Sequence, residues 1–211
     1  MPARKTAFKN IYQFKISLRD HGPEIWRRIQ VPESYSFWGL HVAIQDAMGW
    51  LDCHLHEFRI SDSRSKTLFT IGLEDDDYTD PAEALPKNFL EGHKVLIREW
   101  FTQENNHSDY LYDFGDSWEH GVTLEGIFPR QPGTSYPVCI AGEQACPPED
   151  CGGIHGYMEL LAALGNPRHP EHAEMKEWVG RGFKPGFFDP AAVKFDDPKE
   201  RWKMAMEDAS L

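Results

Sequence analysis

The chain has 211 residues, of which 40% are hydrophobic and 27% charged, which is typical of one globular domain or a domain with an appended part. Acidic residues outnumber Lys and Arg by 34 to 22, and the net charge of −12 excludes a generally basic nucleic-acid-binding surface. No apolar run reaches the roughly 18 residues of a membrane span, and the first residues lack a signal-peptide pattern, so we expect a cytoplasmic protein without a membrane partner.

The first part of the chain shows the periodicities of strands and of one helix. Residues 11–19 and 25–31 alternate apolar and polar side chains, which predicts an antiparallel hairpin around a turn at 20–23. A helical apolar stripe follows, which we expect Ser36 to cap and Gly49 to end. Its members are Leu40, Ala43, Ile44, Ala47 and Met48. Residues 54–61 return to the alternation of a strand.

The second part continues with strands and ends with helices. Residues 94–101 predict a strand, and residues 109–114 and 118–127 predict a hairpin closed by residues 115–117. Residues 129–153 are rich in Pro, Gly and Cys, which predicts an extended loop. Helices are expected from Tyr157 to Gly165, from Pro170 onward, and after the pairs Asp189-Pro190 and Asp197-Pro198.

This order of elements predicts an α+β fold. Strand, strand, helix, strand is the opening of a β-grasp-like mixed sheet with a covering helix. We therefore expect a single domain over residues 1–211, with an α+β sheet core at 10–128. The rest of the domain, residues 129–211, is expected to form the Cys/Pro-rich loop and a helical C-terminal part.

Several strings of residues occur in an order that is similar to a known family. They are Ile25–Ile29, Met48–Trp50, His54–Phe58, Tyr110–His120, Cys146–Gly153 and Asn166–His172. Together they resemble the plasmid ORF-3-like family, which is named from a root-inducing plasmid and includes passenger proteins of insertion elements. The resemblance covers residues 10–195. It implies a plasmid or mobile-element context and does not imply a particular biochemical activity.

Three of the four cysteines fall close together in the predicted loop. Cys139, Cys146, Cys151 and His155 offer thiolate and imidazole ligands, which are the ligands that zinc prefers. A metal would also stabilise a long loop that has little regular structure. The spacing lacks the C-x2-C of zinc ribbons, and the alternative is that the thiols are small hydrophobic side chains in the core. Zinc is thus the candidate cofactor.

A second group of residues predicts a pocket between two strands. If residues 54–61 form a strand, His54 and His56 share one of its faces. The later hairpin could bring an imidazole, two carboxylates and an aromatic side chain beside them. These are Asp113, Asp116, Trp118 and His120. Such a pocket suits a metal or general acid–base chemistry near neutral pH, and the alternative is that the histidines and Trp118 are core residues.

The basic residues concentrate in the first 30 positions. Seven of them stand there against two acidic residues, a local charge of +5, which leaves −17 for the remaining chain. They are Arg4, Lys5, Lys9, Lys15, Arg19, Arg27 and Arg28. The densest acidic run, residues 74–77 with Asp80 and Glu83, predicts a solvated loop.

Three functions are compatible with these observations. The preferred hypothesis is a non-catalytic binding or adaptor protein, stabilised by zinc, whose partner is an unidentified protein or small molecule. The first alternative is a metal-dependent hydrolase or nuclease that uses the histidine and aspartate pocket. The second is a DNA-binding protein that uses the N-terminal basic residues, although the acidity of the remaining chain makes nucleic acid an unfavourable partner.

Overall fold

A computed structural model describes residues 8–19, 24–73 and 86–208. Three expectations lie outside these ranges: the turn at 20–23, the acidic run at 74–77 with Asp80 and Glu83, and the placement of Arg4 and Lys5. In the described part of the chain, none of the helices has the length and apolar character that crossing a membrane requires.

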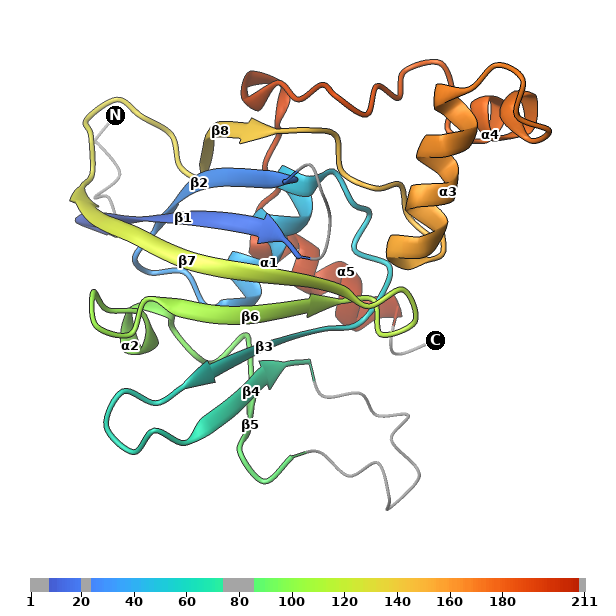
Figure 1. The fold of residues 1–211 in the computed structure, drawn as a ribbon. Coiled ribbons are helices and arrows are strands. Elements are labelled where there is room, and N and C mark those ends of the chain that lie inside the picture. The colour runs from blue at the N-terminus through green and yellow to red at the C-terminus, as the bar shows by residue number, and fades with distance from the viewer. Residues whose placement is uncertain (1–7, 20–23, 74–85, 209–211) are drawn as a thin grey trace.

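The described strands form one eight-stranded mixed sheet (Figure 1). Its strand order is β5-β4-β3-β6-β7-β1-β2-β8, and β4 and β5 are the parallel pair in an otherwise antiparallel sheet. The strands are β1 (Asn10–Leu18), β2 (Trp26–Pro32), β3 (His56–Ser61), β4 (Leu68–Gly72), β5 (Phe89–Glu91), β6 (His107–Tyr112), β7 (Trp118–Pro129) and β8 (Val138–Glu143). The long central strands β1 and β7 join the two halves of the sheet.

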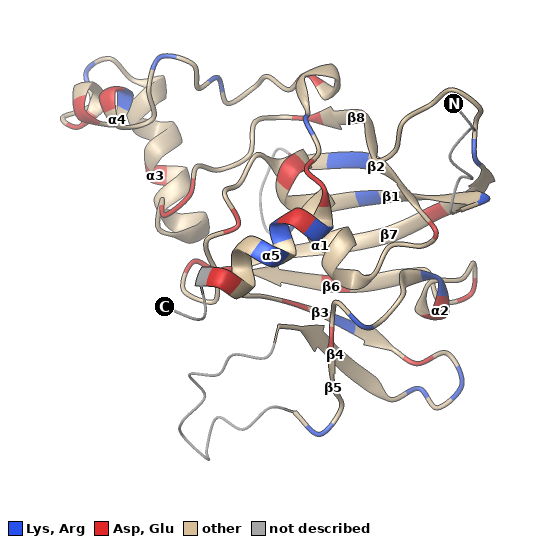
Figure 2. Ribbon diagram, turned by 180° about the vertical axis from the view of Figure 1, so that it is seen from behind, with Lys and Arg blue, Asp and Glu red and all other residues tan. Residues whose placement is uncertain are grey.

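Two helices, α1 (Phe37–Met48) and α5 (Pro198–Asp208), lie on the same face of the sheet (Figure 2). The Ser36 hydroxyl accepts a hydrogen bond from the Gly39 amide at the start of α1. Gly49 ends the helix in the left-handed conformation, with φ of 95°, which glycine adopts without steric penalty. The caps of α1 are therefore those that the sequence predicts.

The core lies between this helical layer and the sheet. Alternate side chains of the strands point into it, among them Phe14 of β1, Phe58 of β3 and Tyr110 of β6, and all three are fully buried. Tyr157 and Leu160, from the C-terminal part of the chain, belong to the same cluster. Residues on both sides of position 129 thus share one hydrophobic core.

The remaining helices are α2 (Ile97–Trp100), α3 (Gly153–Gly165) and α4 (His172–Trp178), with a 3-10 helix at Pro190–Ala192. The Asp189 carboxylate accepts a hydrogen bond from the Ala191 amide. The Asp197 carboxylate likewise accepts a hydrogen bond from the Lys199 amide at the start of α5. The two predicted Asp-Pro helix starts and the end of α3 at Gly165 are confirmed.

The α+β class and the helix-covered mixed sheet are confirmed, but two predicted segments are wrong. Residues 94–101 contain the helical turn α2 instead of a strand, because Ile97 and Phe101, four positions apart, both turn into the core. The predicted loop at 129–153 contains β8, which pairs with β2 at the edge of the sheet. Tertiary pairing creates this strand in a stretch whose local sequence predicts a loop.

Two element boundaries also differ from the predictions. Strand β3 begins at His56, so His54 lies in the segment before it. Helix α4 begins at His172, and Pro170 lies in the preceding turn instead of at the first helical position. The first difference matters for the site, because the shared face of His54 and His56 required both residues to lie in the strand.

Candidate functional site

Three segments that are distant in the sequence meet at one end of the sheet. They are the segment before β3, the turn between β6 and β7, and the residues that lead into α3, all on the same side of the molecule in Figure 1. The Asp113 amide donates to the Leu55 carbonyl at 3.0 Å, which joins the first two segments. The Gly152 amide donates to the Asp116 carboxylate at 3.1 Å, which joins the second and third.

Metal-ligating side chains converge where these segments meet. The Nε2 atom of His54 lies 3.0 Å from Oδ1 of Asp150 and 3.5 Å from Oδ2 of Asp113. One ligand atom from each of these three residues lies within 4.8 Å of the others, and the same holds for Cys53, His54 and Glu149. We call these five residues, with His54 common to both sets, the His54 centre.

Local backbone interactions orient Asp113 toward His54. Its Oδ1 atom accepts hydrogen bonds from the amides of Gly115 at 2.9 Å and Asp116 at 3.2 Å. Asp113 itself has a left-handed backbone with φ of 57°, which aspartate tolerates better than most residues. One oxygen therefore stabilises the turn and the other, Oδ2, faces the imidazole.

Glu149 anchors the segment before α3 to the rest of the centre. Its Oε1 atom accepts hydrogen bonds from the Leu51 amide at 2.7 Å and from the Tyr112 hydroxyl at 3.0 Å. Its Oε2 atom is buried and has no hydrogen-bond partner among the described residues. A buried carboxylate oxygen without a partner is unfavourable in water-free surroundings, and a cation would relieve this.

Gly153 allows the close contact between this segment and the β6–β7 turn. Its φ is +66°, and a Cβ atom at this position would lie 2.7 Å from the carbonyl oxygen of Asp116. A side chain here would therefore both strain the backbone and separate the two segments. The glycine pair 152–153 serves packing between the turn and the start of α3.

The structure brings only part of the predicted pocket together. His54 and Asp113 lie in the His54 centre, and Asp116 supports it through the Gly152 amide. His56, Trp118 and His120 instead point into the core and are nearly or fully buried. Burial lowers the pKa of His120 to about 4 and that of His56 well below its ordinary value, so both are neutral near pH 7.

The predicted zinc ligands are spread over the loop and its neighbours. Cys139 lies in β8 and its Sγ contacts the Ala141 carbonyl at 3.5 Å, whereas His155 is exposed on α3. Burial raises the pKa of Cys151 to about 12 and raises that of Cys146, so both remain protonated thiols. In the described ranges, the clusters of potential metal ligands contain none of Cys139, Cys146, Cys151 and His155.

A buried hydrogen-bond chain supports the segment before β3 and was not predicted. Asp52 Oδ1 lies 2.6 Å from His41 Nε2, and His41 Nδ1 lies 2.9 Å from the Tyr110 hydroxyl. A carboxylate only accepts hydrogen bonds, so His41 donates to Asp52 through Nε2. Gln45 donates to the same hydroxyl at 2.9 Å, and Arg201 of α5 approaches the other Asp52 oxygen at 3.4 Å.

Cys53, Glu149 and Asp150 are the ligand candidates that sequence reasoning missed. Glu149 and Asp150 lie inside the string Cys146–Gly153, which was considered for the family resemblance and for its cysteines as metal ligands. Cys53 is the cysteine most distant from the others in sequence. Its position beside His54 was the available signal, because thiolate and imidazole are the ligands that zinc prefers.

Among the described residues, the basic side chains of β1 and β2 are paired or buried and do not form a free cationic strip. Lys15 pairs with Glu24 at 2.7 Å, and Arg28 donates two hydrogen bonds to Glu125 at 2.6 and 2.7 Å. Arg27 is buried, with 1% of its surface exposed. These pairings reduce the positive charge that phosphate binding would need.

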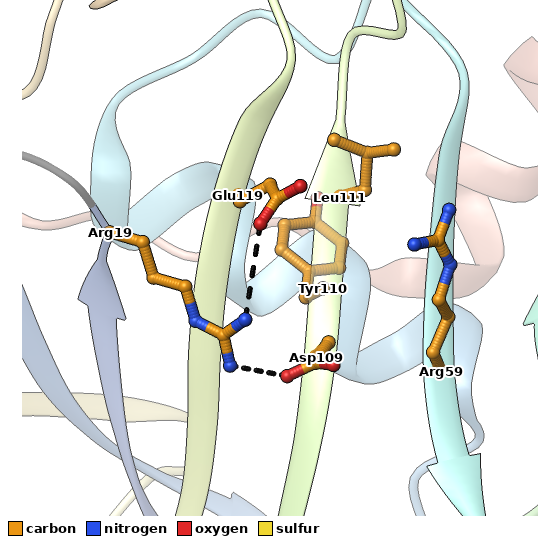
Figure 3. A pocket seen from close by; sticks show the side chains of 6 residues that line it. All are labelled: Arg19, Arg59, Asp109, Tyr110, Leu111 and Glu119. Atoms are coloured by element: carbon orange, nitrogen blue, oxygen red, sulfur yellow. Dashed lines mark hydrogen bonds and ion pairs between the residues drawn. The ribbon is translucent and has the colours of Figure 1, made fainter.

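Arg19 is paired as well. It forms ion pairs with Asp109 and Glu119 at the edge of a shallow pocket on the sheet face opposite α1 (Figure 3). Arg59, on the other side of this pocket, pairs with Glu57. The charges around the pocket are thus balanced within the protein.

Comparisons with known proteins identify one family and two similar proteins. The sequence model of the family described as plasmid pRiA4b ORF-3-like protein matches residues 10–193. The chain is 35% identical to the uncharacterized protein y4hQ of Sinorhizobium fredii, over 92% of this chain and 94% of that protein. It is also similar to the crystal structure of a protein of unknown function from Methanosarcina mazei Go1, with 42% identity and a TM-score of 0.81 over 89% of this chain and 99% of that one.

Proposed function

We propose that this chain, which belongs to the plasmid pRiA4b ORF-3-like family, is a binding protein whose His54 centre holds a divalent cation. The observation that carries the proposal is the convergence of His54, Asp113 and Asp150, whose ligand atoms lie within 4.8 Å although they come from three segments. Imidazole nitrogen and carboxylate oxygen are ligands that zinc and manganese share.

Electrostatics supports a cation at this place. The carboxylates of Asp113, Glu149 and Asp150 approach one imidazole, and like charges at short range repel each other. Asp113 is only 6% exposed, so water screens its charge poorly. A divalent cation would convert this repulsion into attraction and would add a further link between the three segments.

The surroundings of the centre favour binding over catalysis. Asp113 accepts hydrogen bonds from amides of its own turn, whereas Asp116 and Glu149 accept them from amides of neighbouring segments, so a bound cation would fix the shape of these segments. Leu51 beside Cys53 is 77% exposed and Phe114 beside Asp113 is 43% exposed. Segments fixed by a metal and carrying exposed apolar side chains fit a surface that a protein or small molecule binds.

Metal-dependent hydrolysis is a second candidate function, and the accessibility of the centre favours it. The Asp150 side chain is 71% exposed, so solvent reaches the ligand atoms. Three protein ligands with an open position for water are the arrangement of catalytic zinc sites. The Glu149 carboxylate, which lies beside Cys53 and His54, would be the general base in this case.

The decisive experiment measures metal content and affinity in the full chain. We expect the chelator-treated protein to bind about one Zn²⁺ or Mn²⁺ per chain, and His54→Ala to lower the affinity for both, because His54 belongs to both ligand sets. The loss should exceed the about 10-fold to 100-fold that supporting residues of metal sites contribute. His155→Ala is the matched control, since His155 is exposed and belongs to the cysteine-rich set.

The outcomes separate the candidate sites and functions. Retained metal in His54→Ala together with loss in His155→Ala or Cys146→Ser would refute the proposal and locate the metal at the predicted cysteine set. Absence of metal binding in the wild type would refute both locations. Hydrolysis of ester or phosphodiester substrates that requires the metal and His54 would replace the binding function by the catalytic one.

A further inference from the structure

The His54 centre contains two ligand sets of different chemical character. One set consists of Cys53, His54 and Glu149, and the other of His54, Asp113 and Asp150. Within each set the ligand atoms lie within 4.8 Å of one another. The first set offers a thiol, an imidazole and one carboxylate, whereas the second offers an imidazole and two carboxylates.

The Tyr112 hydroxyl holds the first set in place. It accepts a hydrogen bond from the Cys53 amide at 3.2 Å and donates to Glu149 at 3.0 Å. The Sγ atom of Cys53 lies 3.9 Å from the same hydroxyl, and its side chain is accessible to solvent. Glu149 keeps its buried Oε2 atom free of protein partners among the described residues, so an oxygen ligand remains for a cation.

The two carboxylates of the second set are held by contacts other than the Tyr112 hydroxyl. Asp113 is oriented by the amides of the β6–β7 turn, and Asp150 lies 3.0 Å from the Nε2 atom of His54. Substitutions of Cys53 or Asp150, both exposed, therefore change one set and leave the hydrogen bonds that hold the other set intact.

Ligand softness assigns a different ion to each set. Thiolate and imidazole select zinc, whereas carboxylate-rich sets suit harder ions such as manganese. Both sets require His54, so an ion in one set competes with an ion in the other. We propose that the centre holds one ion at a time, Zn²⁺ through Cys53, His54 and Glu149, or Mn²⁺ through His54, Asp113 and Asp150. Cys53 is then the residue that determines the metal preference; this inference rests on the proposed function.

The test compares two single variants of the full chain with two metals. Cys53→Ser should lower the affinity for Zn²⁺ at least about 10-fold and leave the affinity for Mn²⁺ within about twofold, because direct ligands contribute more than supporting residues. Asp150→Asn should have the opposite pattern. With Co²⁺ as a spectroscopic probe, the wild type should show a thiolate-to-cobalt charge-transfer band that Cys53→Ser abolishes.

Each result bears on one of the two statements. If His54→Ala leaves both affinities unchanged, the proposed function and this inference both fail. If His54→Ala weakens binding but Cys53→Ser changes neither metal, the inference fails and the proposed function stands. If Cys53→Ser and Asp150→Asn weaken both metals equally, the centre is one mixed site and the two-set inference is overturned. Circular dichroism of each variant verifies that it is folded.

Discussion

Arg27 provides a quantitative test of how this fold accommodates a buried charge. Its side chain is 1% exposed and its guanidinium donates to three backbone carbonyl oxygens, those of Ala47 at 2.9 Å, Trp26 at 2.8 Å and Glu143 at 2.9 Å. The Phe188 ring stacks on the guanidinium with 3.6 Å between Cζ and the ring centroid. Burial lowers the pKa of Arg27, although the side chain stays charged at neutral pH.

The expected effect of Arg27→Met follows from two opposing contributions. Three hydrogen bonds from a charged donor stabilise by about 1.5–3 kcal/mol each, or about 4.5–9 kcal/mol in total. Removing the guanidinium also removes the desolvation penalty of a buried ion, which amounts to several kcal/mol. The Ala47 carbonyl lies in the last turn of α1 and has no partner within the helix. We therefore expect the free energy of unfolding to fall by about 2–4 kcal/mol.

Urea unfolding followed by tryptophan fluorescence measures this difference. The matched control is Arg28→Met, because Arg28 is the neighbouring residue on the opposite face of β2 and pairs with Glu125 at a partly exposed site. Such ion pairs contribute about 0–1 kcal/mol, so the control should change little. If Arg27→Met is as stable as the wild type or more stable, the carbonyl interactions only offset desolvation and the reasoning is refuted.

Two further predictions concern stability. A Cβ at Gly156 would lie 1.9 Å from the Cys151 carbonyl oxygen, whereas a Cβ at Gly165 of the same helix would meet open space. We therefore expect Gly156→Ala to lower the free energy of unfolding by more than about 2 kcal/mol, and Gly165→Ala to change it by less than about 1 kcal/mol. Equal melting temperatures would contradict this. The pKa of His120 is about 4 in the folded state and 6.5 in its ordinary range, so the unfolded chain binds the proton more readily at acid pH. Between pH 7 and pH 4 the free energy of unfolding should fall by about 3 kcal/mol on this account. His120→Phe should remove that part of the pH dependence, and an unaltered profile would be evidence against it.

Regular periodicity made much of the fold predictable. The alternating residues of β1 and β2 and the apolar stripe of α1 gave correct elements, because each pattern extends over enough residues to distinguish a strand from a helix. Residues 94–101 and 138–143 were too short for this distinction. Their conformations depend on partners elsewhere, on α1 for the first and on β2 for the second.

The candidate site was less predictable, because its contacts connect loops that have no periodicity. His54 and Asp113 were selected, but on the assumption that His54 shares a strand face with His56. The strand starts at His56, which turns inward and stacks on His41 with ring centroids 3.4 Å apart. His54 lies outside the strand, so its side chain does not follow the alternation between the two faces of the sheet. It contacts Asp150, which is 96 residues away in sequence.

Proximity in sequence was also misleading for the cysteines. Cys139 and Cys146 lie near each other along the chain, yet β8 carries Cys139 into the sheet, and neither thiol belongs to a cluster of potential metal ligands among the described residues. Cys53, remote from the others in sequence, lies beside His54 and Glu149. The chemistry of a thiol depends on its surroundings, which spacing alone does not describe.

The backbone conformation in the three segments of the His54 centre supports the proposal that the centre binds a cation. Among the described non-glycine residues, six have positive φ, and Asp52, Asp113, Ser117 and Asp150 lie in the three segments of the centre. A left-handed backbone is unfavourable for such residues, and closely spaced carboxylates are unfavourable as well. Glycine at these positions would remove the backbone strain, and a neutral side chain would remove the repulsion between carboxylates. A bound divalent cation would offset both at Asp113 and Asp150, since it would bind their carboxylates and stabilise the segments that hold them.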